Sequence, residues 1–86
     1  MAFVYILKSL KNDKHYIGST QDVEKRFKTH QSGGVLSTRG LRPLELVFQQ
    51  QYTDIDTARK IEKKLKKFKR RDYINKIVKD GSIKFS

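Results

Sequence analysis

Cysteine is absent from this 86-residue chain, and so are long hydrophobic runs. Without cysteine the protein has neither disulfide bonds nor a thiolate metal site, and its redox compartment is left undetermined. No apolar run approaches the ~20 residues of a membrane-spanning helix, and the N-terminus lacks the basic-then-apolar pattern of a signal peptide. We therefore expect a soluble, cytoplasmic protein that does not contact membranes.

Motifs of several common site types are missing as well. The sequence has no internal repeat and no zinc-ligand spacing, and the pair Gly33-Gly34 lacks the Gly-Lys-Ser or Gly-Lys-Thr that completes a phosphate-binding P-loop.

A chain of this length provides one domain with a small core, over residues 1–86, in which residues 82–86 are expected to form a frayed tail.

Acidic residues are few compared with basic ones. Nine Asp and Glu stand against 20 Lys and Arg, which gives a net charge of +11 at pH 7. A positive field of this size attracts polyanions, and nucleic acid is the usual one. Acidic membranes, acidic proteins and simple solubilisation of a small domain are the alternatives.

Two short segments rich in aromatic and β-branched residues open the chain, at 3–7 and 16–18, and a polar break separates them. This pattern predicts a β-hairpin. A two-residue turn at 12–13 would place residues whose numbers sum to 25 opposite each other. Tyr5 and Tyr16 then share one face, as the floor of a site or simply as ordinary strand aromatics. The other face carries Val4, Ile6 and Ile17.

Four further elements and one loop are expected. Residues 19–34 form a helix with cap candidates at its start, Asp22 among them, and glycines at its end. A loop covers 33–43, and a strand follows with Leu44, Leu46 and Phe48 on one face. Two helices complete the chain, from near Asp54 or Asp56 to about Lys69 and from Asp72 to Gly81. The first of them has one buried stripe, formed by Ala58, Ile61, Leu65 and Phe68.

Basic side chains gather in two places. The loop 33–43 carries Arg39 and Arg42, which suit a phosphate backbone, although an ordinary surface connection explains them equally well. The helix that follows the third strand carries the remaining candidate nucleic-acid contacts: Lys63, Lys66, Lys67, Lys69 and Arg70.

Glu62 is the single acid between Thr57 and Arg71. Pairing with Lys66, four residues on, is the ordinary fate of such a helix glutamate. Glu62 also borders the buried stripe, so its carboxylate can point toward the sheet and offer a divalent cation one anionic ligand. On the helix 19–34, Arg26 and His30 lie beside its apolar contact, and we expect both at the rim of the buried stripe.

The tripeptides Val4-Tyr5-Ile6 and Tyr16-Ile17-Gly18 resemble the signature of the GIY-YIG nuclease family. The first departs from it, because Phe3 and Val4 stand where the family has glycine and isoleucine. Arg26 falls ten residues after Tyr16, the distance at which the family carries its arginine. The segment 58–66 is similar to the helix that carries the family's metal-binding glutamate, and it resembles the small, free-standing members most.

The resemblance implies a metal-dependent nuclease with Tyr5, Tyr16, Arg26 and Glu62 in its site. Glu62 would hold one Mg²⁺ or Mn²⁺, and Arg26 would bind a non-bridging phosphate oxygen. One tyrosine would orient or deprotonate the attacking water, which requires nearby positive charge to lower its pKa. Either tyrosine can fill this role, and Tyr16 is preferred.

Further positions follow from the same resemblance. Small relatives often have a histidine where His30 stands, one turn beyond Arg26, where it would contact phosphate or relay a proton. The alternative for His30 is a polar surface residue. Ser19 occupies the place of a lysine that helps to activate the tyrosine in some relatives, and Lys14 is a candidate substitute. Asn75 is the one candidate for an asparagine that many members place near the metal.

We therefore expect an α/β (α+β) fold of the GIY-YIG type. It would contain a small three-stranded antiparallel sheet flanked by helices, in the order β-β-α-β-α-α, with the site on one sheet face. The expected function is hydrolysis of phosphodiester bonds in DNA by a metal-dependent endonuclease, structure-directed or non-specific. A protein partner would supply any targeting. The alternatives are a basic nucleic-acid-binding module without useful catalysis and a basic protein-interaction domain.

Overall fold

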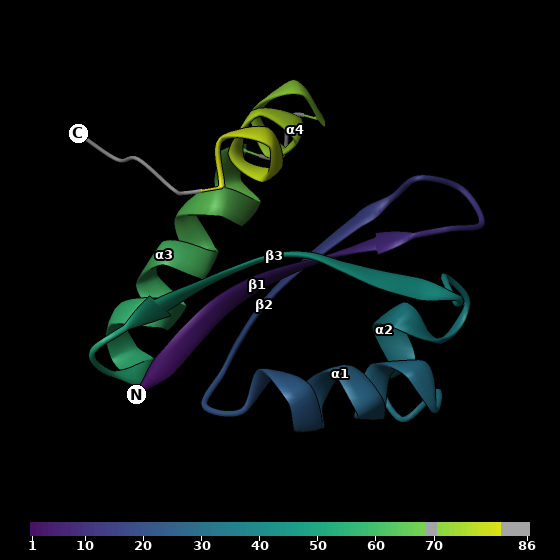
Figure 1. The fold of residues 1–86 in the computed structure, drawn as a ribbon, viewed down its shortest axis with the longest axis horizontal. Helices are drawn as coiled ribbons and strands as arrows, with labels where there is room; N and C mark the ends of the chain where they lie inside the picture. The colour runs from purple at the N-terminus through teal and green to yellow at the C-terminus, as the bar shows by residue number, and fades with distance from the viewer. Residues whose placement is uncertain (69–70, 82–86) are drawn as a thin grey trace.

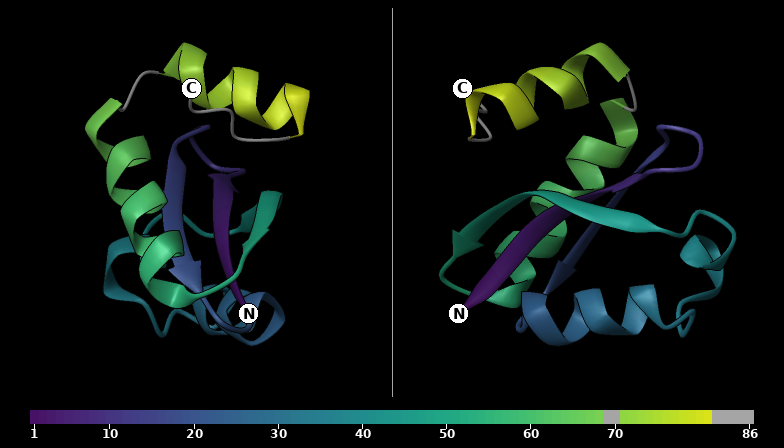
Figure 2. Two further views of the ribbon diagram at one scale, coloured as in Figure 1. Left: turned by 90° about the vertical axis from the view of Figure 1, so that its left-hand side faces the viewer. Right: turned by 45° about the vertical axis from the view of Figure 1, so that its right-hand side comes forward.

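The computed structural model describes residues 1–68 and 71–81. A three-stranded antiparallel sheet lies at its centre, in the order β2-β1-β3. Its strands are β1 (Ala2–Ser9), β2 (His15–Thr20) and β3 (Leu44–Tyr52). The helices α3 and α4 cover one face of the sheet, and α1 and α2 lie against the other (Figures 1 and 2). The expected α+β fold with a three-stranded antiparallel sheet is confirmed.

The hairpin register differs from the expected one. Residues whose numbers sum to 23 lie opposite each other, so Tyr5 faces Gly18. The connection is longer than two residues, because the Ser9 hydroxyl oxygen accepts the Lys11 N–H at 3.2 Å and the Ser9 N–H donates to the Lys14 carbonyl at 2.8 Å. The predicted two-residue turn is therefore wrong. A register shift of two residues preserves the faces, however, because side chains alternate with a period of two.

A β-bulge divides β3 between the two faces of the sheet. Ile6 lies opposite Phe48, whereas Leu7 lies opposite Leu46. The extra residue, Val47, shifts the alternation. Phe48 consequently packs with Ile6 on the α3 side, while Leu46 packs with Leu7 on the α1 side. The expectation that Phe48 shares a face with Leu46 is wrong.

Each face of the sheet carries its own apolar cluster. The larger cluster joins the sheet to α3 and α4, and its buried members are Ala2, Val4, Ile6, Ile17, Phe48, Ala58, Leu65, Ile74 and Ile77. The smaller cluster packs against α1, with Tyr5, Leu7 and Leu44 buried at its centre and Phe27 partly buried beside them. The buried stripe predicted for α3 is confirmed at Ala58 and Leu65, both 0% exposed. The side chain of Phe68 lies outside the described part of the chain.

Two of the helices, α1 and α3, begin at capping carboxylates. Asp22 precedes α1 (Val23–Gln31) and accepts the Lys25 N–H at 3.0 Å. Asp54 precedes α3 (Ile55–Phe68) and accepts the Thr57 N–H at 2.7 Å. The last helix, α4 (Arg71–Asp80), ends at Gly81, whose φ is +75°. None of the helices described over 1–68 and 71–81 is long and apolar enough to cross a membrane.

A short helix, α2 (Leu36–Arg39), interrupts the segment expected to be a loop. The N–H groups of Thr38 and Arg39 both donate to the Val35 carbonyl, at 3.2 and 3.0 Å. A single turn of helix is too short to leave a periodic pattern in the sequence. The element order is therefore β-β-α-α-β-α-α, with one helix more than expected.

Candidate active site

The ring of Tyr5 crosses the strand β2 directly above Gly18. Tyr5 lies opposite Gly18 in the hairpin and is only 2% exposed. A Cβ built on Gly18 would meet the phenol oxygen and ring of Tyr5 at distances that real Cβ atoms do not show. Glycine at position 18 therefore lets the phenol lie flat against β2 and reach the helix α1.

Tyr5 begins a chain of buried hydrogen bonds. Its hydroxyl lies 2.9 Å from Nε2 of His30, and Nδ1 of His30 lies 2.7 Å from the hydroxyl oxygen of Thr38. The Thr38 hydroxyl in turn donates to the Val35 carbonyl at 3.4 Å. In this arrangement the Thr38 oxygen accepts from His30 Nδ1–H, which leaves a lone pair on Nε2 to accept from Tyr5.

His30 is fully buried, at 0% exposed. The expectation that it lies at the rim of α1 is wrong, because its two ring nitrogens are held by β1 on one side and α2 on the other. Burial, and to a lesser degree the charge of Arg26, lowers the pKa of His30 from 6.5 to about 4. The imidazole is therefore neutral at pH 7 and can accept a proton only while another group stabilises the charge.

Arg26 lies beside the phenols of Tyr5 and Tyr16. Burial raises the pKa of Tyr5, while its interaction with the Arg26 guanidinium acts in the opposite direction. The same contact with Tyr5 raises the pKa of Arg26. Arg26 is exposed, as expected for a residue at the rim of α1. Its permanent charge thus stands at the open side of the tyrosine pair.

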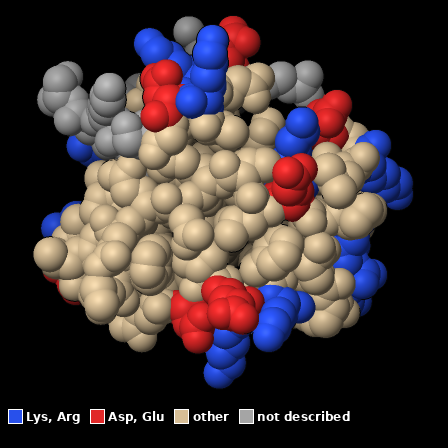
Figure 3. Space-filling model, in the orientation of Figure 1, with Lys and Arg blue, Asp and Glu red and all other residues tan. Residues whose placement is uncertain are grey.

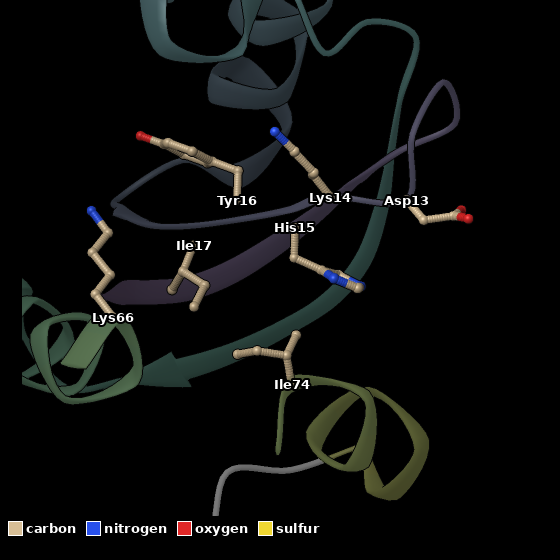
Figure 4. Close-up of a pocket in the computed structure, with 7 residues that line it drawn as sticks. All are labelled: Asp13, Lys14, His15, Tyr16, Ile17, Lys66 and Ile74. Carbon is tan, nitrogen blue, oxygen red and sulfur yellow. The ribbon is translucent and has the colours of Figure 1, made fainter. Parts of the chain in front are cut away.

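Tyr16 is the more accessible phenol of the pair. Its ring centroid lies 5.0 Å from that of His30 and 6.4 Å from that of Tyr5. It is partly exposed, whereas Tyr5 is buried. Tyr16 and Lys14 point to one side of β2, and His15 and Ile17 point to the other (Figure 4). Tyr16 thus packs against the buried hydrogen-bond chain while remaining open to solvent.

Glu62 lies on α3 and points toward the strand β2. One of its carboxylate oxygens accepts a hydrogen bond from the Ser19 hydroxyl, and the other pairs with the Lys66 ammonium at 2.6 Å. Its side chain is 18% exposed. Both interpretations from the sequence hold in part, because Glu62 pairs with Lys66 and also points toward the sheet.

Lys66 connects Glu62 with Tyr16. Its ammonium nitrogen lies 5.7 Å from the centroid of the Tyr16 ring, although α3 covers the face of the sheet opposite to Tyr16. β2 is one of the two edge strands of the sheet, so a side chain can pass around it. The site therefore wraps around the edge strand β2, and the expectation of a site confined to one sheet face is wrong.

An open groove of about 490 Å³ runs along this edge. Figure 4 shows the seven residues that line it, drawn from the end of the hairpin, β2, α3 and α4: Asp13, Lys14, His15, Tyr16, Ile17, Lys66 and Ile74. Two ammonium groups, one phenol, one imidazole and the carboxylate of Asp13 thus border a surface to which Ile17 and Ile74 contribute apolar area. A groove of this composition suits a sugar-phosphate backbone.

The fit of Glu62 to a divalent metal ion can be judged from its partners. Carboxylate oxygens are the ligands that Mg²⁺ and Mn²⁺ prefer, and Glu62 already holds one cation, the ammonium of Lys66. Within the described residues, no group of three or more His, Asp or Glu side chains forms a ready-made metal cage. Glu62 thus fits as a single protein ligand, with the remaining ligands left to water and substrate.

The other predicted contacts are dispersed. Arg39 donates to the Gly33 carbonyl at 2.9 Å and Arg42 to the Arg39 carbonyl at 3.0 Å, so both arginines brace their own loop. Lys63 and Lys67 are exposed on α3, and Asn75 is exposed on α4. Lys69 and Arg70 lie outside the described residues.

One member of the hydrogen-bond chain has no signal in the sequence. Thr38 is fully buried and fixes the orientation of His30. It stands in a segment without periodicity, and only the folding of α2 onto α1 brings it to the imidazole. Ser19 differs, since its position beside Gly18 already marked it, although its partner Glu62 comes from a distant helix.

Comparison with known proteins agrees with this geometry. The family model of the GIY-YIG catalytic domain matches residues 1–77. This chain belongs to the GIY-YIG family. The predicted membership of this family is thereby confirmed, and the chain is placed in a family of nucleases.

Relatives within this family include UPF0213 proteins. One from Staphylococcus haemolyticus is 36% identical over 76 residues, which cover 87% of this chain and 92% of the relative. Another from Clostridium perfringens is 36% identical over 85 residues, covering 98% and 89%. The solution NMR structure of a UPF0213 protein from Bacillus halodurans matches with a TM-score of 0.57 at 35% identity, over 94% of this chain and 87% of that one. The UPF0213 names state no activity, metal or substrate.

Proposed function

We propose that this GIY-YIG protein is a metal-dependent endonuclease that hydrolyses phosphodiester bonds in DNA, in a structure-directed or non-specific manner. The observation that carries the proposal is the convergence of four elements at the edge strand β2. Tyr5, Tyr16, Arg26 and His30 come from β1, β2 and α1, and Glu62 reaches the same edge from α3. Phosphodiester hydrolysis needs an activated water, positive charge at the phosphate and stabilisation of the leaving oxygen.

Tyr16 is the residue assigned to the water. It is partly exposed, lines the groove and has the positive charges of Lys66 and Arg26 nearby. Tyr5 is less suited, because its hydroxyl is buried and already donates to His30. Arg26 is exposed beside both phenols, where its planar guanidinium can bind a non-bridging phosphate oxygen.

His30 is assigned a positioning role that can extend to a proton relay. Its neutral imidazole accepts from Tyr5 and packs edge-on against Tyr16. It therefore fixes both rings relative to Arg26. A proton that leaves Tyr5 would pass to Nε2, while Thr38 holds the opposite nitrogen.

Glu62 is assigned to one Mg²⁺ or Mn²⁺. Such a cation supplies Lewis acidity at the scissile phosphate and the leaving oxygen. Ser19 orients the Glu62 carboxylate from β2, across the edge strand from the phenols. The carboxylate, the guanidinium and the phenols would then act from the two sides of the strand edge on a phosphate bound there.

The strand edge also offers a path for the DNA backbone. Lys14 and Lys66 border the groove, and Lys63 and Lys67 are exposed on the same helix as Lys66. In contrast, the face shown in Figure 3 has a mostly uncharged centre, with charged side chains of both signs at its rim. DNA that follows the groove would pass directly beside Tyr16.

The test is cleavage of labelled single-stranded, duplex and branched DNA, and of RNA of matching sequence, with Mg²⁺ or Mn²⁺. We expect Tyr16→Phe to bind DNA like the wild type and Glu62→Gln to bind it at least as tightly, since the substitution frees Lys66. Both variants should lose cleavage by about 100-fold or more. Matched controls are Glu45→Gln, at an exposed carboxylate of β3, and Tyr52→Phe, at the far end of the same strand. Both controls should cleave like the wild type.

A binding module without useful catalysis remains the second candidate. It is favoured by one observation, the neutralisation of Glu62 by Lys66. A wild-type protein that binds every nucleic acid in a strongly salt-dependent way, and cuts none of them in either metal, would establish that candidate. Cleavage that survives Glu62→Gln would show that the metal site has been assigned to the wrong residue.

A further inference from the structure

We propose that Lys66 is an internal cation that keeps Glu62 from binding a divalent metal ion until a nucleic-acid phosphate draws the ammonium group away. The inference rests on the proposed function in taking Glu62 as the metal ligand. It adds that metal binding and nucleic-acid binding are coupled through one side chain of the protein.

The ion pair engages the carboxylate that would hold the metal ion. The Lys66 ammonium lies 2.6 Å from one oxygen of Glu62, and the Ser19 hydroxyl donates to the other. Glu62 and Lys66 stand four residues apart on α3, so the pair forms within a single helix. The free protein therefore presents a carboxylate with both oxygens engaged and its charge already balanced.

The two partners differ in how easily they can leave. Glu62 is 18% exposed and is tied to β2 by Ser19, whereas the Lys66 side chain is 42% exposed and lines the open groove. Its ammonium already extends past the strand edge to lie 5.7 Å from the centroid of the Tyr16 ring. A phosphate entering beside Tyr16 meets this ammonium first and can pair with it, since the flexible stem of lysine needs no rearrangement of the backbone.

When either the metal ion or the phosphate separates Glu62 from Lys66, the other ligand binds more tightly. A phosphate that captures Lys66 frees the Glu62 carboxylate for metal, and a metal ion at Glu62 frees Lys66 for phosphate. By linkage the two effects are equal. A metal ion held by one carboxylate would also attract the phosphate directly, which would couple the two ligands independently of Lys66. The contribution of Lys66 is therefore measured by substituting it.

The experiment is a Mn²⁺ titration followed by paramagnetic broadening of the backbone amide signals of residues 61–63. It is carried out on the free protein and in the presence of a phosphorothioate oligonucleotide, which resists cleavage. The variants are Lys66→Met, Lys67→Met and Glu62→Gln. Lys67→Met removes the same charge from an exposed position next along α3 and corrects for the general change in electrostatic field. Lys66→Gln is a second variant that checks for any effect of methionine on the fold.

We expect the free Lys66→Met protein to bind Mn²⁺ about five-fold more tightly than Lys67→Met, the factor that corresponds to ~1 kcal/mol for a partly shielded ion pair. The oligonucleotide should raise the Mn²⁺ affinity of both the wild type and Lys66→Met. The factor by which it does so should be about five-fold larger for the wild type. If free Lys66→Met and Lys67→Met bind Mn²⁺ equally tightly, and the broadening is lost in Glu62→Gln, the role of Lys66 is overturned while the metal assignment of Glu62 stands. Broadening that persists in Glu62→Gln would overturn the metal assignment of the proposed function and the coupling with it.

Discussion

The buried histidine should make the stability of this protein depend on pH in a defined window. His30 is fully buried between Tyr5 and Thr38, and its pKa is lowered from 6.5 to about 4. An unfolded chain releases it to water, where it protonates near its ordinary pKa. Between these two values the unfolded state therefore binds one proton more than the folded state. Stability must fall as the pH falls through this window.

The size of the effect follows from the two pKa values. Stability from neutral His30 is fully present above pH 6.5, declines toward pH 4 and stays constant below it. Each pKa unit of difference between the folded and unfolded states is worth about 1.4 kcal/mol. Acidification through the full window therefore lowers the free energy of unfolding by about 3 kcal/mol. That is a large share of the 5–15 kcal/mol that typically stabilises a small domain. Tyr5 and Arg26, which act on His30, have pKa values that are raised above ordinary values already far above this range.

The assay is urea unfolding at a series of pH values from 4 to 8, comparing wild type with His30→Gln. Glutamine keeps a polar side chain in the pocket but does not titrate, so its free energy of unfolding should show only the background of carboxylates and of His15, which the two proteins share. Subtracting the two curves cancels that background. The difference should change by about 3 kcal/mol between pH 7 and pH 4, with the wild type losing stability on acidification.

A constant difference across the whole pH range would refute the reasoning. It would mean that His30 titrates alike in the folded and unfolded states, and hence that the imidazole is neither desolvated nor held neutral by Tyr5 and Thr38. A difference of opposite sign, with the wild type gaining stability in acid, would mean that the folded state binds the proton more tightly and that His30 is charged at the site.

Two further predictions concern the residues that hold the Tyr5–His30 pair. Gly18→Ala should lower the free energy of unfolding by about 1–3 kcal/mol in urea titrations, because the new methyl group overpacks the site against the Tyr5 ring. The control is Gly40→Ala, which should leave the free energy of unfolding nearly unchanged, because a Cβ at this position meets nothing within 4 Å. Thr38→Val should cost about 1–3 kcal/mol by leaving the buried Nδ1 of His30 without its partner, whereas Thr29→Val, which removes an exposed hydroxyl from α1, should cost much less. A Thr38→Val protein as stable as Thr29→Val would argue against the assigned orientation of the imidazole.

Local patterns in the sequence were enough to place much of this site. The alternation of a strand puts Tyr5 and Tyr16 on one face and Ile6 and Ile17 on the other, and this holds although the turn is longer than expected. The spacing of Ala58 and Leu65 fixes the buried side of α3, and with it the position of Glu62 beside that side. Asp22 is among the cap candidates that the sequence offers for α1, since capping depends on nearby backbone groups only. The expected start of this helix at residue 19 is wrong, because Ser19 and Thr20 belong to β2.

Long-range packing decided the rest. The burial of His30 depends on α2, a single turn without a periodic signal, which brings Thr38 to one side of the ring while β1 brings Tyr5 to the other. The bulge that moves Phe48 to the opposite face of the sheet depends on how β3 pairs with β1.

The same holds for the wrapping of the site around β2. Periodicity determines which residues share one face of α3. Whether Glu62 meets Ser19 and Lys66 reaches Tyr16 depends on how α3 docks across the edge of the sheet. The sequence by itself therefore determined which side chains are available and which face each occupies, because those properties follow from the local periods of strands and helices. Only the tertiary structure decided which of them meet, because contacts between distant segments depend on packing that no short stretch of sequence encodes.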